Sequence, residues 1–569
     1  MNCLGVVMVY MTSSYFETFL GKLFLTNMFV IMTAIFCLFL ILFVLNIKTI
    51  KKELKISKKT ALILLLIFLF GFFLRNVEYR YGWGLDGLFY PTSAKYLIEQ
   101  NIFTMGCAIG NVNQCVLYHQ PLYPAGYPYL ISILYLLFGI NSIYAMQLSA
   151  IFSSLTIIIV FYCASILLKN EEAGLYGAVI FTLIPLELYA AGTSAARPTS
   201  LFFIGLTLLF YLISLKKDDA KMWCLTAITL SYSIYVRQEN IVLLFPIFLG
   251  LFLFKYNYKD FTFKINKKEA AKFFYAIIIL IVTLIPFFYL TFSQLQNSSP
   301  RQPTFSFEYF RIMAPIMLSN MFSTKVIFFQ MYFNPFISGL VFFSTIFLLK
   351  EYKRKELIFS WSIFVAFFLV ISFYYQTPGF PKNFSADYLR FMQDLNFPCA
   401  LIAGFTIFQT REIIKKKTKI NGDILMAATL LLTLLILLPT SDVKFPNTMF
   451  KDGRLDENSG YVKVGDLIMA INNTPNDCLI ITSQDTLVAS DILKNNQRSV
   501  VDIELIKAFN GKMALDEMKK ASCIRFLKDY RCNSNADELC QYIDSILNLT
   551  FLFKQGTVEV YDGKLKNVL

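Results

Sequence analysis

Residues 78–101 read EYRYGWGLDGLFYPTSAKYLIEQN, and residues 119–141 read HQPLYPAGYPYLISILYLLFGIN. Apolar residues recur at helical spacing over 86–100, and 122–138 is apolar with Tyr at its edges. Neither segment needs to span a bilayer, so both predict helices that lie at the membrane interface with Tyr and Trp at headgroup depth. Long apolar runs flank this stretch on both sides. It therefore predicts a large first loop outside the bilayer of a multi-span membrane protein.

The composition of the whole chain agrees with this interpretation. Of 569 residues, 56% are hydrophobic, 17% aromatic and 16% charged, and the mean hydropathy is +0.56. A soluble domain is about half apolar and about a quarter charged. These values exclude a disordered chain, a collagen-like fibre and a small disulfide scaffold. The single histidine, His119, excludes a metal site built from several histidines.

Apolar runs long enough to span a bilayer recur along most of the chain. We expect about twelve transmembrane helices and an all-α membrane part. The first run is too long for a signal peptide and lacks a clear cleavage site of small residues. The predicted spans lie near 24–46, 59–75, 143–167, 173–190, 198–215, 222–236, 239–255, 272–292, 335–350, 357–375, 392–409 and 423–440, and 222–255 also reads as one long kinked segment.

Basic residues set the expected orientation. The net charge of +14 is not gathered on one face, as nucleic-acid binding would require. Lysines and arginines instead cluster in alternate loops, around 48–59, 216–221, 255–268, 350–355 and 411–419, which we therefore place in the cytoplasm. The loops 76–142, 293–334 and 376–391 and the tail 441–569 then lie on the extracytoplasmic side.

Sequons and cysteines agree with that orientation. Asn-x-Ser/Thr sequons begin at Asn297, Asn383, Asn472 and Asn548, all on the predicted outer side. Six of the eleven cysteines are also predicted outside: Cys107, Cys115, Cys478, Cys523, Cys532 and Cys540. An oxidising compartment would allow disulfides Cys107–Cys115 and Cys532–Cys540, which share one spacing; free buried thiols are the alternative.

Several motifs together resemble a known enzyme class. Asp86 heads the first interfacial segment, and HQPLYP (119–124) comes before LLFG (136–139) and a span. RQE (237–239) follows an apolar run, and YLRF (388–391) stands before Pro398. In order and spacing these motifs resemble GT-C class membrane glycosyltransferases, near the protein O-mannosyltransferase, aminoarabinose transferase and RgtA/B/C/D-like families. The resemblance covers roughly 59–440, after an extra N-terminal helix and basic loop (1–58).

Two departures from the family pattern concern acidic residues. The family often has two adjacent acids in the first loop, but here Gly87 follows Asp86. A second acid often starts the span near 198, but here the residues are Arg197, Pro198 and Thr199. Since no Asp-x-Asp occurs near the loop, we predict no metal-dependent mechanism and no cofactor, and leave a divalent metal open.

The resemblance implies a sugar donor carried on a polyprenyl phosphate, such as dolichyl phosphate, and a protein, lipid or polysaccharide acceptor. The acceptor hydroxyl must lose a proton as it attacks the anomeric carbon. We assign Asp86 as the base, a role worth about 10²–10⁴-fold in rate. The leaving phosphate needs positive charge, which guanidinium groups supply. We assign donor-phosphate binding to Arg80, Arg237, Arg390 and Arg197, and substrate positioning to Glu78 (the reserve base), His119, Tyr123 and Glu239.

Each assignment has a structural alternative. Asp86 also suits the N-cap of its helix, and the two roles are compatible. Arg237 and Glu239 also suit an ion pair at a membrane end, although ionisable groups beside spans are functional candidates. Arg390 also suits a surface salt bridge with a neighbouring acid, and His119 suits a packed interfacial aromatic.

After about residue 440 the composition becomes charged, and we predict a small α/β accessory domain over 441–569. Strands are expected at 478–482 and 523–527 and a hairpin at 549–562. Helices are expected at 485–494, 513–522 and 535–546. The domain has no catalytic constellation, and either acceptor binding or a purely structural cap suits it.

Two other functions fit a polytopic chain. A transporter or flippase would show internal repeats and broken spans near the bilayer midplane, and no clear repeat is visible. A polyprenyl-linked glycan polymerase or ligase would place Arg and His in a late outer loop. Loop 293–334 has Arg301 and Arg311 but no His. We therefore expect a membrane glycosyltransferase.

Overall fold

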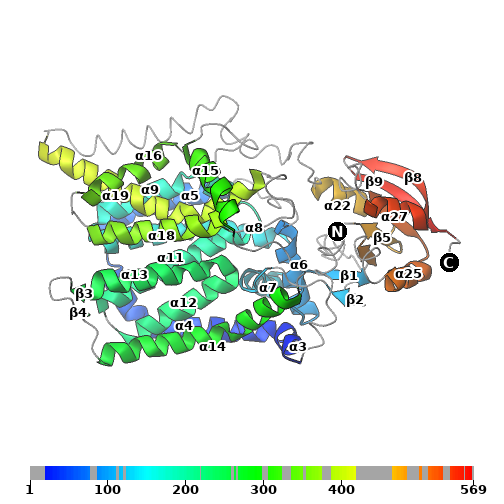
Figure 1. Cartoon of the computed structure of the whole chain (residues 1–569), viewed down its shortest axis with the longest axis horizontal. Helices are drawn as coiled ribbons and strands as arrows, with labels where there is room; N and C mark the ends of the chain where they lie inside the picture. Colours follow the sequence, from blue (N-terminus) through cyan, green and yellow to red (C-terminus); the bar gives the residue numbers. More distant parts are fainter. Residues whose placement is uncertain are drawn as a thin grey trace.

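The structure, a computed structural model, consists of a body of long helices and a β-sheet formed largely by the C-terminal region (Figure 1). The hairpin β1–β2 and the helix α6 lie between these two parts. The structure describes residues 19–76, 86–110, 115–118, 123–217, 219–257, 262–263, 267–297, 306–322, 335–349, 354–373, 386–417, 464–482, 499–502, 511–528, 538–556 and 558–566.

The helical body follows the apolar runs of the sequence. Apolar helices form in a bilayer because the chain must satisfy its own backbone hydrogen bonds there. The elements of this part are α3 (Phe19–Thr26), α4 (Met28–Glu53), α5 (Lys58–Arg75), α8 (Ile143–Leu168), α9 (Glu171–Thr182), α10 (Pro185–Ala191), α11 (Ala196–Lys217), α12 (Ala220–Val236), η1 (Gln238–Leu243), α13 (Leu244–Lys255), β3 (Tyr256–Asn257), β4 (Thr262–Phe263), α14 (Lys267–Asn297), α15 (Phe307–Phe322), α16 (Pro335–Phe343), α17 (Thr345–Leu349), α18 (Arg354–Phe373), η2 (Ala386–Leu395) and α19 (Asn396–Lys417).

The expected count of about twelve spans is not confirmed. Among the described residues, seven helices are long and apolar enough to cross a membrane, or eight if α9 and α10, bent by 64°, form one span. Each of the first eleven apolar runs coincides with one helix or two consecutive helices, but several are short or broken. The twelfth run, 423–440, lies outside the described residues. The chain is thus a multi-pass membrane protein, and within its described residues fewer helices are full-length spans than the apolar runs suggest.

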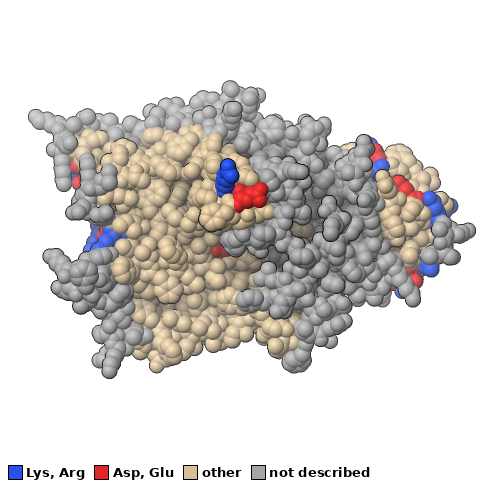
Figure 2. Space-filling model, viewed as in Figure 1, with Lys and Arg blue, Asp and Glu red and all other residues tan. Residues whose placement is uncertain are grey.

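The basic loops meet at one end of the helical body. Glu53, at the end of α4, pairs with Lys216 and Lys217, at the end of α11, at 2.5 and 2.6 Å. Arg411, near the end of α19, pairs with Glu172 at the start of α9. In Figure 2 charged side chains are sparse on the described face of the helices and gather at one end and on the C-terminal sheet. This arrangement is what insertion with one basic side requires.

The first loop folds into two helices with a hairpin between them. The helix α6 (Asp86–Glu99) and the helix α7 (Gly126–Phe138) lie where the sequence predicts them. Every side chain from Tyr90 to Leu97 is buried, so α6 is covered more completely than its amphipathic repeat indicates. The reason is that α7 and α4 both pack against it. The helix α7 exposes only its last turn, 136–138, which is apolar and suits contact with lipid.

The C-terminal region forms a mixed sheet with helices. Its elements are α22 (Val464–Asn472), β5 (Leu479–Thr482), β6 (Val500–Asp502), α25 (Gly511–Lys520), β7 (Ile524–Lys528), α27 (Glu538–Ile546), β8 (Leu547–Gln555) and β9 (Val558–Leu565). Strands β6, β5 and β7 are parallel, and the hairpin β8–β9 adds antiparallel strands beside β7. The expected strands and hairpin are present, and α25 and α27 match two of the expected helices. The strand β6 and the helix α22 were not predicted. The third expected helix, 485–494, lies outside the described residues.

The sheet also contains strands from the first loop. The strand β1 (Cys107–Gly110) pairs antiparallel with β6 and with its own hairpin partner β2 (Cys115–Tyr118). The resulting seven-stranded order is β2-β1-β6-β5-β7-β9-β8. Ile109 is fully buried in the same core as Leu479 and Val501. The C-terminal sheet therefore lies on the same side of the helical body as the first loop, and the tail is not structurally separate from it.

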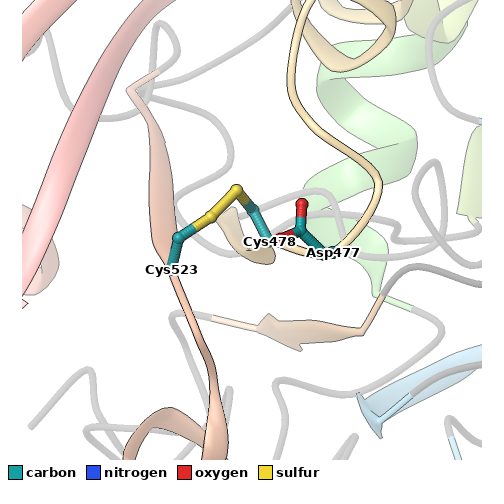
Figure 3. Close-up of side chains that lie close together, drawn as sticks. All are labelled: Asp477, Cys478 and Cys523. Atoms are coloured by element: carbon teal, nitrogen blue, oxygen red, sulfur yellow. A yellow bond between two sulfur atoms is a disulfide. The ribbon is translucent and has the colours of Figure 1, made fainter.

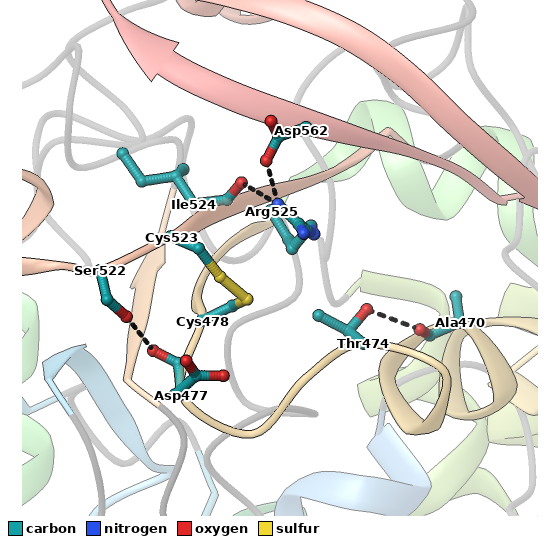
Figure 4. The surroundings of a disulfide bond; sticks show 9 residues. All are labelled: Ala470, Thr474, Asp477, Cys478, Ser522, Cys523, Ile524, Arg525 and Asp562. Carbon is teal, nitrogen blue, oxygen red and sulfur yellow. Dashed lines mark hydrogen bonds and ion pairs between the residues drawn. A yellow bond between two sulfur atoms is a disulfide. The ribbon is translucent and has the colours of Figure 1, made fainter.

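Two disulfides lie in this region, Cys107–Cys115 and Cys478–Cys523. The first closes the β1–β2 hairpin at the pair suggested by spacing. The second joins the residues just before β5 and β7, close to the Arg525–Asp562 ion pair (Figure 4). Asp477 lies beside it, but both sulfurs are bonded to each other and are not free as metal ligands (Figure 3). The expected Cys532–Cys540 pairing falls outside the described side chains.

Ile109→Ala is expected to loosen the C-terminal sheet from the first loop. Removing a fully buried Ile side chain costs about 2–5 kcal/mol, whereas Ile109→Val costs about 0.5–1.5 kcal/mol. Limited proteolysis of the full-length protein in detergent, followed over a temperature series, measures the effect. We expect the C-terminal region of Ile109→Ala to be cleaved at a clearly lower temperature than that of Ile109→Val. Equal cleavage of both variants and the parent would show that Ile109 does not hold the hairpin in the sheet.

Candidate functional site

Four of the residues assigned to catalysis, phosphate binding or substrate positioning have described side chains: Arg197, Arg237, Glu239 and Tyr123. For two more the backbone alone is described. Asp86 is the first residue of α6, and Arg390 lies in η2. Glu78, Arg80 and His119 lie outside the described residues, so their assigned roles stay predictions.

Two helix ends position the arginines. Arg197 stands in the first turn of α11, and Arg237 follows α12 with an extended backbone (φ −150°, ψ 127°). The Asn240 side-chain amide stabilises this break by donating to the Ser233 carbonyl oxygen at 2.8 Å and to the Ser200 hydroxyl at 2.8 Å. The segment 222–255 is thus broken at Arg237 and is not one long helix. The break turns Arg237 and Glu239 into the interior of the protein, where both are largely buried.

These arginines form a compact buried cluster with two carboxylates and a ring. Arg197 Nη1 contacts Asp394 Oδ2 at 2.7 Å, and Arg237 Nη2 contacts Glu239 Oε1 at 2.5 Å. The Phe391 ring lies 4.0 Å from the guanidinium carbon of Arg197 and 6.0 Å from that of Arg237. The ring thus joins the two ion pairs through cation–π contacts. We call these five residues the arginine cluster.

The arginine cluster is balanced in charge but retains hydrogen-bonding capacity. Arg237 also interacts electrostatically with Asp394, and Glu239 with Arg197, so the four charges form one network. Among the described residues, Arg237 Nε and Asp394 Oδ1 have no hydrogen-bond partner. A buried polar atom without a partner costs free energy. A ligand oxygen beside Arg237 would remove that cost, so the cluster suits binding of an anionic group.

Tyrosines connect the arginine cluster to the first loop. Tyr90, one helical turn after Asp86 in α6, interacts electrostatically with Arg237. The Tyr90 ring lies 5.1 Å from that of Tyr123 and 5.1 Å from that of Tyr127. Tyr123 also lines a small cavity of about 30 Å³, which Gln238, the neighbour of Arg237, borders as well. The first turns of α6 therefore lie close to the buried arginines.

The rest of the cavity wall is apolar. Besides Tyr123 and Gln238 it is formed by Met28, Phe103, Pro124, Ala125, Tyr235, Phe287, Leu290 and Thr291, from α4, the first loop, α12 and α14. A mainly apolar wall close to the charge-balanced arginine cluster suits a ligand that has both a hydrocarbon part and a charged head.

Sequence reasoning missed four buried charged residues near the site, one of which is Arg75 at the end of α5 (1% exposed). Asp394 is 2% exposed, Glu187 in α10 is fully buried, and Lys95 in α6 is 1% exposed. Lys95 lies 3.5 Å from Glu99, and its burial lowers its pKa. A signal for two of them was present. Glu187 is an acid inside the apolar run 173–190, and Asp394 stands at the head of the run 392–409. Acids within or beside membrane spans are functional candidates by default.

Comparisons with known proteins agree on one architecture. The sequence profile of the dolichyl-phosphate-mannose-protein mannosyltransferase family matches residues 122–289. Among curated protein sequences no significant match is found.

Two solved structures share the fold at low sequence identity. Archaeoglobus fulgidus oligosaccharyltransferase AglB, in complex with an inhibitory peptide and a dolichol-phosphate, is 11% identical with a TM-score of 0.50 over 90% of this chain and 74% of that one. ArnT from Cupriavidus metallidurans, bound to undecaprenyl phosphate, is 10% identical with a TM-score of 0.51 over 89% of this chain and 98% of that one. The chain therefore has the GT-C fold of polytopic membrane glycosyltransferases, as the order of its motifs indicated.

Proposed function

We propose that this protein transfers a sugar from a polyprenyl-phosphate carrier to an acceptor on the extracytoplasmic face. The observation that carries the proposal is the buried arginine cluster next to the first turns of α6. Its buried cations suit a phosphate, and Asp86 begins the helix that reaches it. The family match and the GT-C fold support the same reaction class.

The donor site combines a charged and an apolar surface. Arg237, whose Nε has no partner among described residues, and Arg197 would bind the phosphate, with Arg80 and Arg390 as further candidates from the sequence. The apolar cavity wall beside Gln238 suits the first part of a lipid chain. AglB and ArnT were solved with dolichol-phosphate and undecaprenyl phosphate respectively, and this chain would take a carrier of the same chemical class.

The proposed reaction is a single displacement. The acceptor oxygen forms a bond to the anomeric carbon as the bond from that carbon to the phosphate oxygen breaks. Asp86 accepts the proton of the acceptor hydroxyl, and the polyprenyl phosphate leaves as an anion beside the arginines. One displacement inverts the anomeric configuration. Tyr123 and Glu239 would position the substrates, and Glu78 and His119 are further candidates in the same loop.

We place the C-terminal region on the extracytoplasmic side, as an accessory domain for acceptor binding or for covering the site. Its sheet includes the first-loop hairpin, so loop and tail share one side. The two disulfides suit an oxidising compartment. Asn472 and Asn548, which begin sequons, are both exposed and so accessible to modification.

Transfer from labelled polyprenyl-phosphate sugars tests the proposal. Membranes containing the protein, and matched membranes without it, are given a panel of hexosyl and pentosyl donors, and host-envelope extract serves as the acceptor source. We expect the label to move to acceptor, with equimolar release of polyprenyl phosphate, only where the protein is present. Absence of transfer and of donor cleavage, together with solute or lipid flux above background, would replace this proposal with transport.

A further inference from the structure

A second buried polar cluster lies beside the arginine cluster and belongs to no assigned role. It consists of Arg75 at the end of α5, Ser153 in α8, Glu187 in α10, Gln393 in η2 and Asn396 at the start of α19. All five residues are at most 1% exposed. We call this set the Glu187 cluster. Five separate elements of the helical body thus meet at one carboxylate.

Both oxygens of the Glu187 carboxylate accept hydrogen bonds. Ser153 Oγ donates to Oε1 at 2.5 Å, and Gln393 Nε2 and Asn396 Nδ2 donate to Oε2 at 2.9 and 3.1 Å. Arg75 supplies the countercharge, since it interacts electrostatically with Glu187 and its Nε donates to Ser153 at 2.8 Å. A buried carboxylate with this many donors is satisfied and held in one orientation.

The two clusters share one short stretch of chain. Gln393 and Asn396 bind Glu187, while Phe391 and Asp394 of the same stretch hold Arg197. The carbonyl oxygen of Phe391 also accepts from Arg197 Nη1 at 3.3 Å. Two pairs of side chains, each three residues apart, therefore face two different charged groups. Moving this stretch would move the groups that orient Arg197.

We propose that Glu187 is a positioning residue for donor binding. By holding Gln393 and Asn396, it sets the place of η2 and therefore the place of Phe391 and Asp394, which fix the Arg197 guanidinium. This inference rests on the proposed function, because the ligand that Arg197 would bind is the donor phosphate. Glu187 itself touches Ser153, Gln393 and Asn396 and is not placed against substrate.

Glu187→Gln tests the proposal with little change in shape. The amide keeps an oxygen for Ser153, but its NH₂ group faces the NH₂ groups of Gln393 and Asn396, and Arg75 loses its countercharge. In the double variant Glu187→Gln with Gln393→Glu, the carboxylate is moved from position 187 to position 393. Donor and acceptor exchange places in the hydrogen bond between these two positions, and the contact with Asn396 is not restored. The matched control is Glu172→Gln, because Glu172 is 52% exposed and pairs with Arg411 at the end of the body where the basic loops meet.

Two readouts are compared in full-length protein: KM and kcat for the donor, and the rise in melting temperature on adding polyprenyl phosphate alone. We expect Glu187→Gln to raise KM and weaken polyprenyl-phosphate binding by roughly 10-fold or more, the scale of a charge-assisted hydrogen bond, with a smaller change in kcat. The double variant should recover part of this loss in KM and in polyprenyl-phosphate binding. Glu172→Gln should match the parent.

The outcomes are distinguishable. If Glu187→Gln lowers only the melting temperature of the free protein and its folded fraction keeps the parent's KM and binding, Glu187 is purely structural and the proposal is wrong. Failure of the double variant to recover binding would also contradict it. If the parent shows no transfer with any donor, the proposed function fails first. In that case the measurement of polyprenyl-phosphate binding tests the role of Glu187 by itself. If the parent does not bind polyprenyl phosphate, both the proposed function and the role of Glu187 are wrong.

Discussion

Asp86→Asn is expected to lower the rate of sugar transfer by about 10²–10⁴-fold, which is the contribution of a positioned general base. Asn keeps the size of the side chain and remains a favoured N-cap residue, so the helix α6 should still begin at this position. The change removes only the ability to take the proton from the acceptor hydroxyl. The measurement is the initial rate of transfer from the active donor, normalised to the amount of inserted protein.

Glu99→Gln is the matched control for this prediction. Glu99 ends the same helix, and its side chain is 35% exposed and paired with Lys95. Because Lys95 is 1% exposed, removing its partner should lower the stability of the protein. The rate of transfer per inserted protein should nevertheless stay close to that of the parent, since Glu99 lies at the opposite end of α6 from Asp86. Equal rates in Asp86→Asn and the parent would leave Asp86 as a helix cap and direct the search for the base to Glu78 or Glu239.

The second large effect is expected from Arg237→Gln. This change should lower kcat/KM for the donor by on the order of 100-fold, because a buried guanidinium–phosphate contact is worth about 2–5 kcal/mol when one partner is removed. The Nε atom of Arg237 has no hydrogen-bond partner among the described residues, and its chain neighbour Gln238 borders the cavity that Tyr123 also lines. Donor kinetics in membranes and polyprenyl-phosphate binding in detergent measure the two parts of the effect.

Arg237→Lys separates binding from folding. Lysine keeps the charge that compensates buried Glu239, so the ion pair and the fold should persist, but it lacks the planar fork of donors. We expect a milder loss for Lys, about 10-fold, mostly in KM. If Arg237→Gln reduces only the folded fraction while KM and polyprenyl-phosphate binding stay at parent values, Arg237 and Glu239 form a structural ion pair and the phosphate assignment fails.

Local features that depend on nearby residues could be predicted from the sequence. The apolar runs predicted where the helices lie, because each segment by itself must be apolar enough to lie in the hydrocarbon and must form its own backbone hydrogen bonds. The repeat after Asp86 placed α6, and the short buried strands at 478–482 and 523–527 appear as β5 and β7. The motif RQE (237–239) was rightly treated as a helix end, and Arg237 and Glu239 do form the ion pair that was the structural alternative to a functional role.

Other features depend on residues far apart in the chain. Arg197 meets Asp394 across 197 positions, and Gln393 reaches Glu187 across 206. Ile109 belongs to a core whose other members follow residue 478. No local pattern encodes such contacts, because hydrophobic periodicity reports which face of a segment is buried and not which segment covers it.

The amino-acid sequence by itself determined a polytopic helical membrane protein, the place of its first loop and the class of enzyme it resembles. These three features follow from the hydropathy of the segments, the charges between the apolar runs and the order of the motifs, all of which can be read along the chain. The tertiary structure alone decided that Arg197 pairs with Asp394 and interacts with Glu239, and that the first-loop hairpin completes the C-terminal sheet. Buried charges must find partners, and folding brings those partners from distant segments.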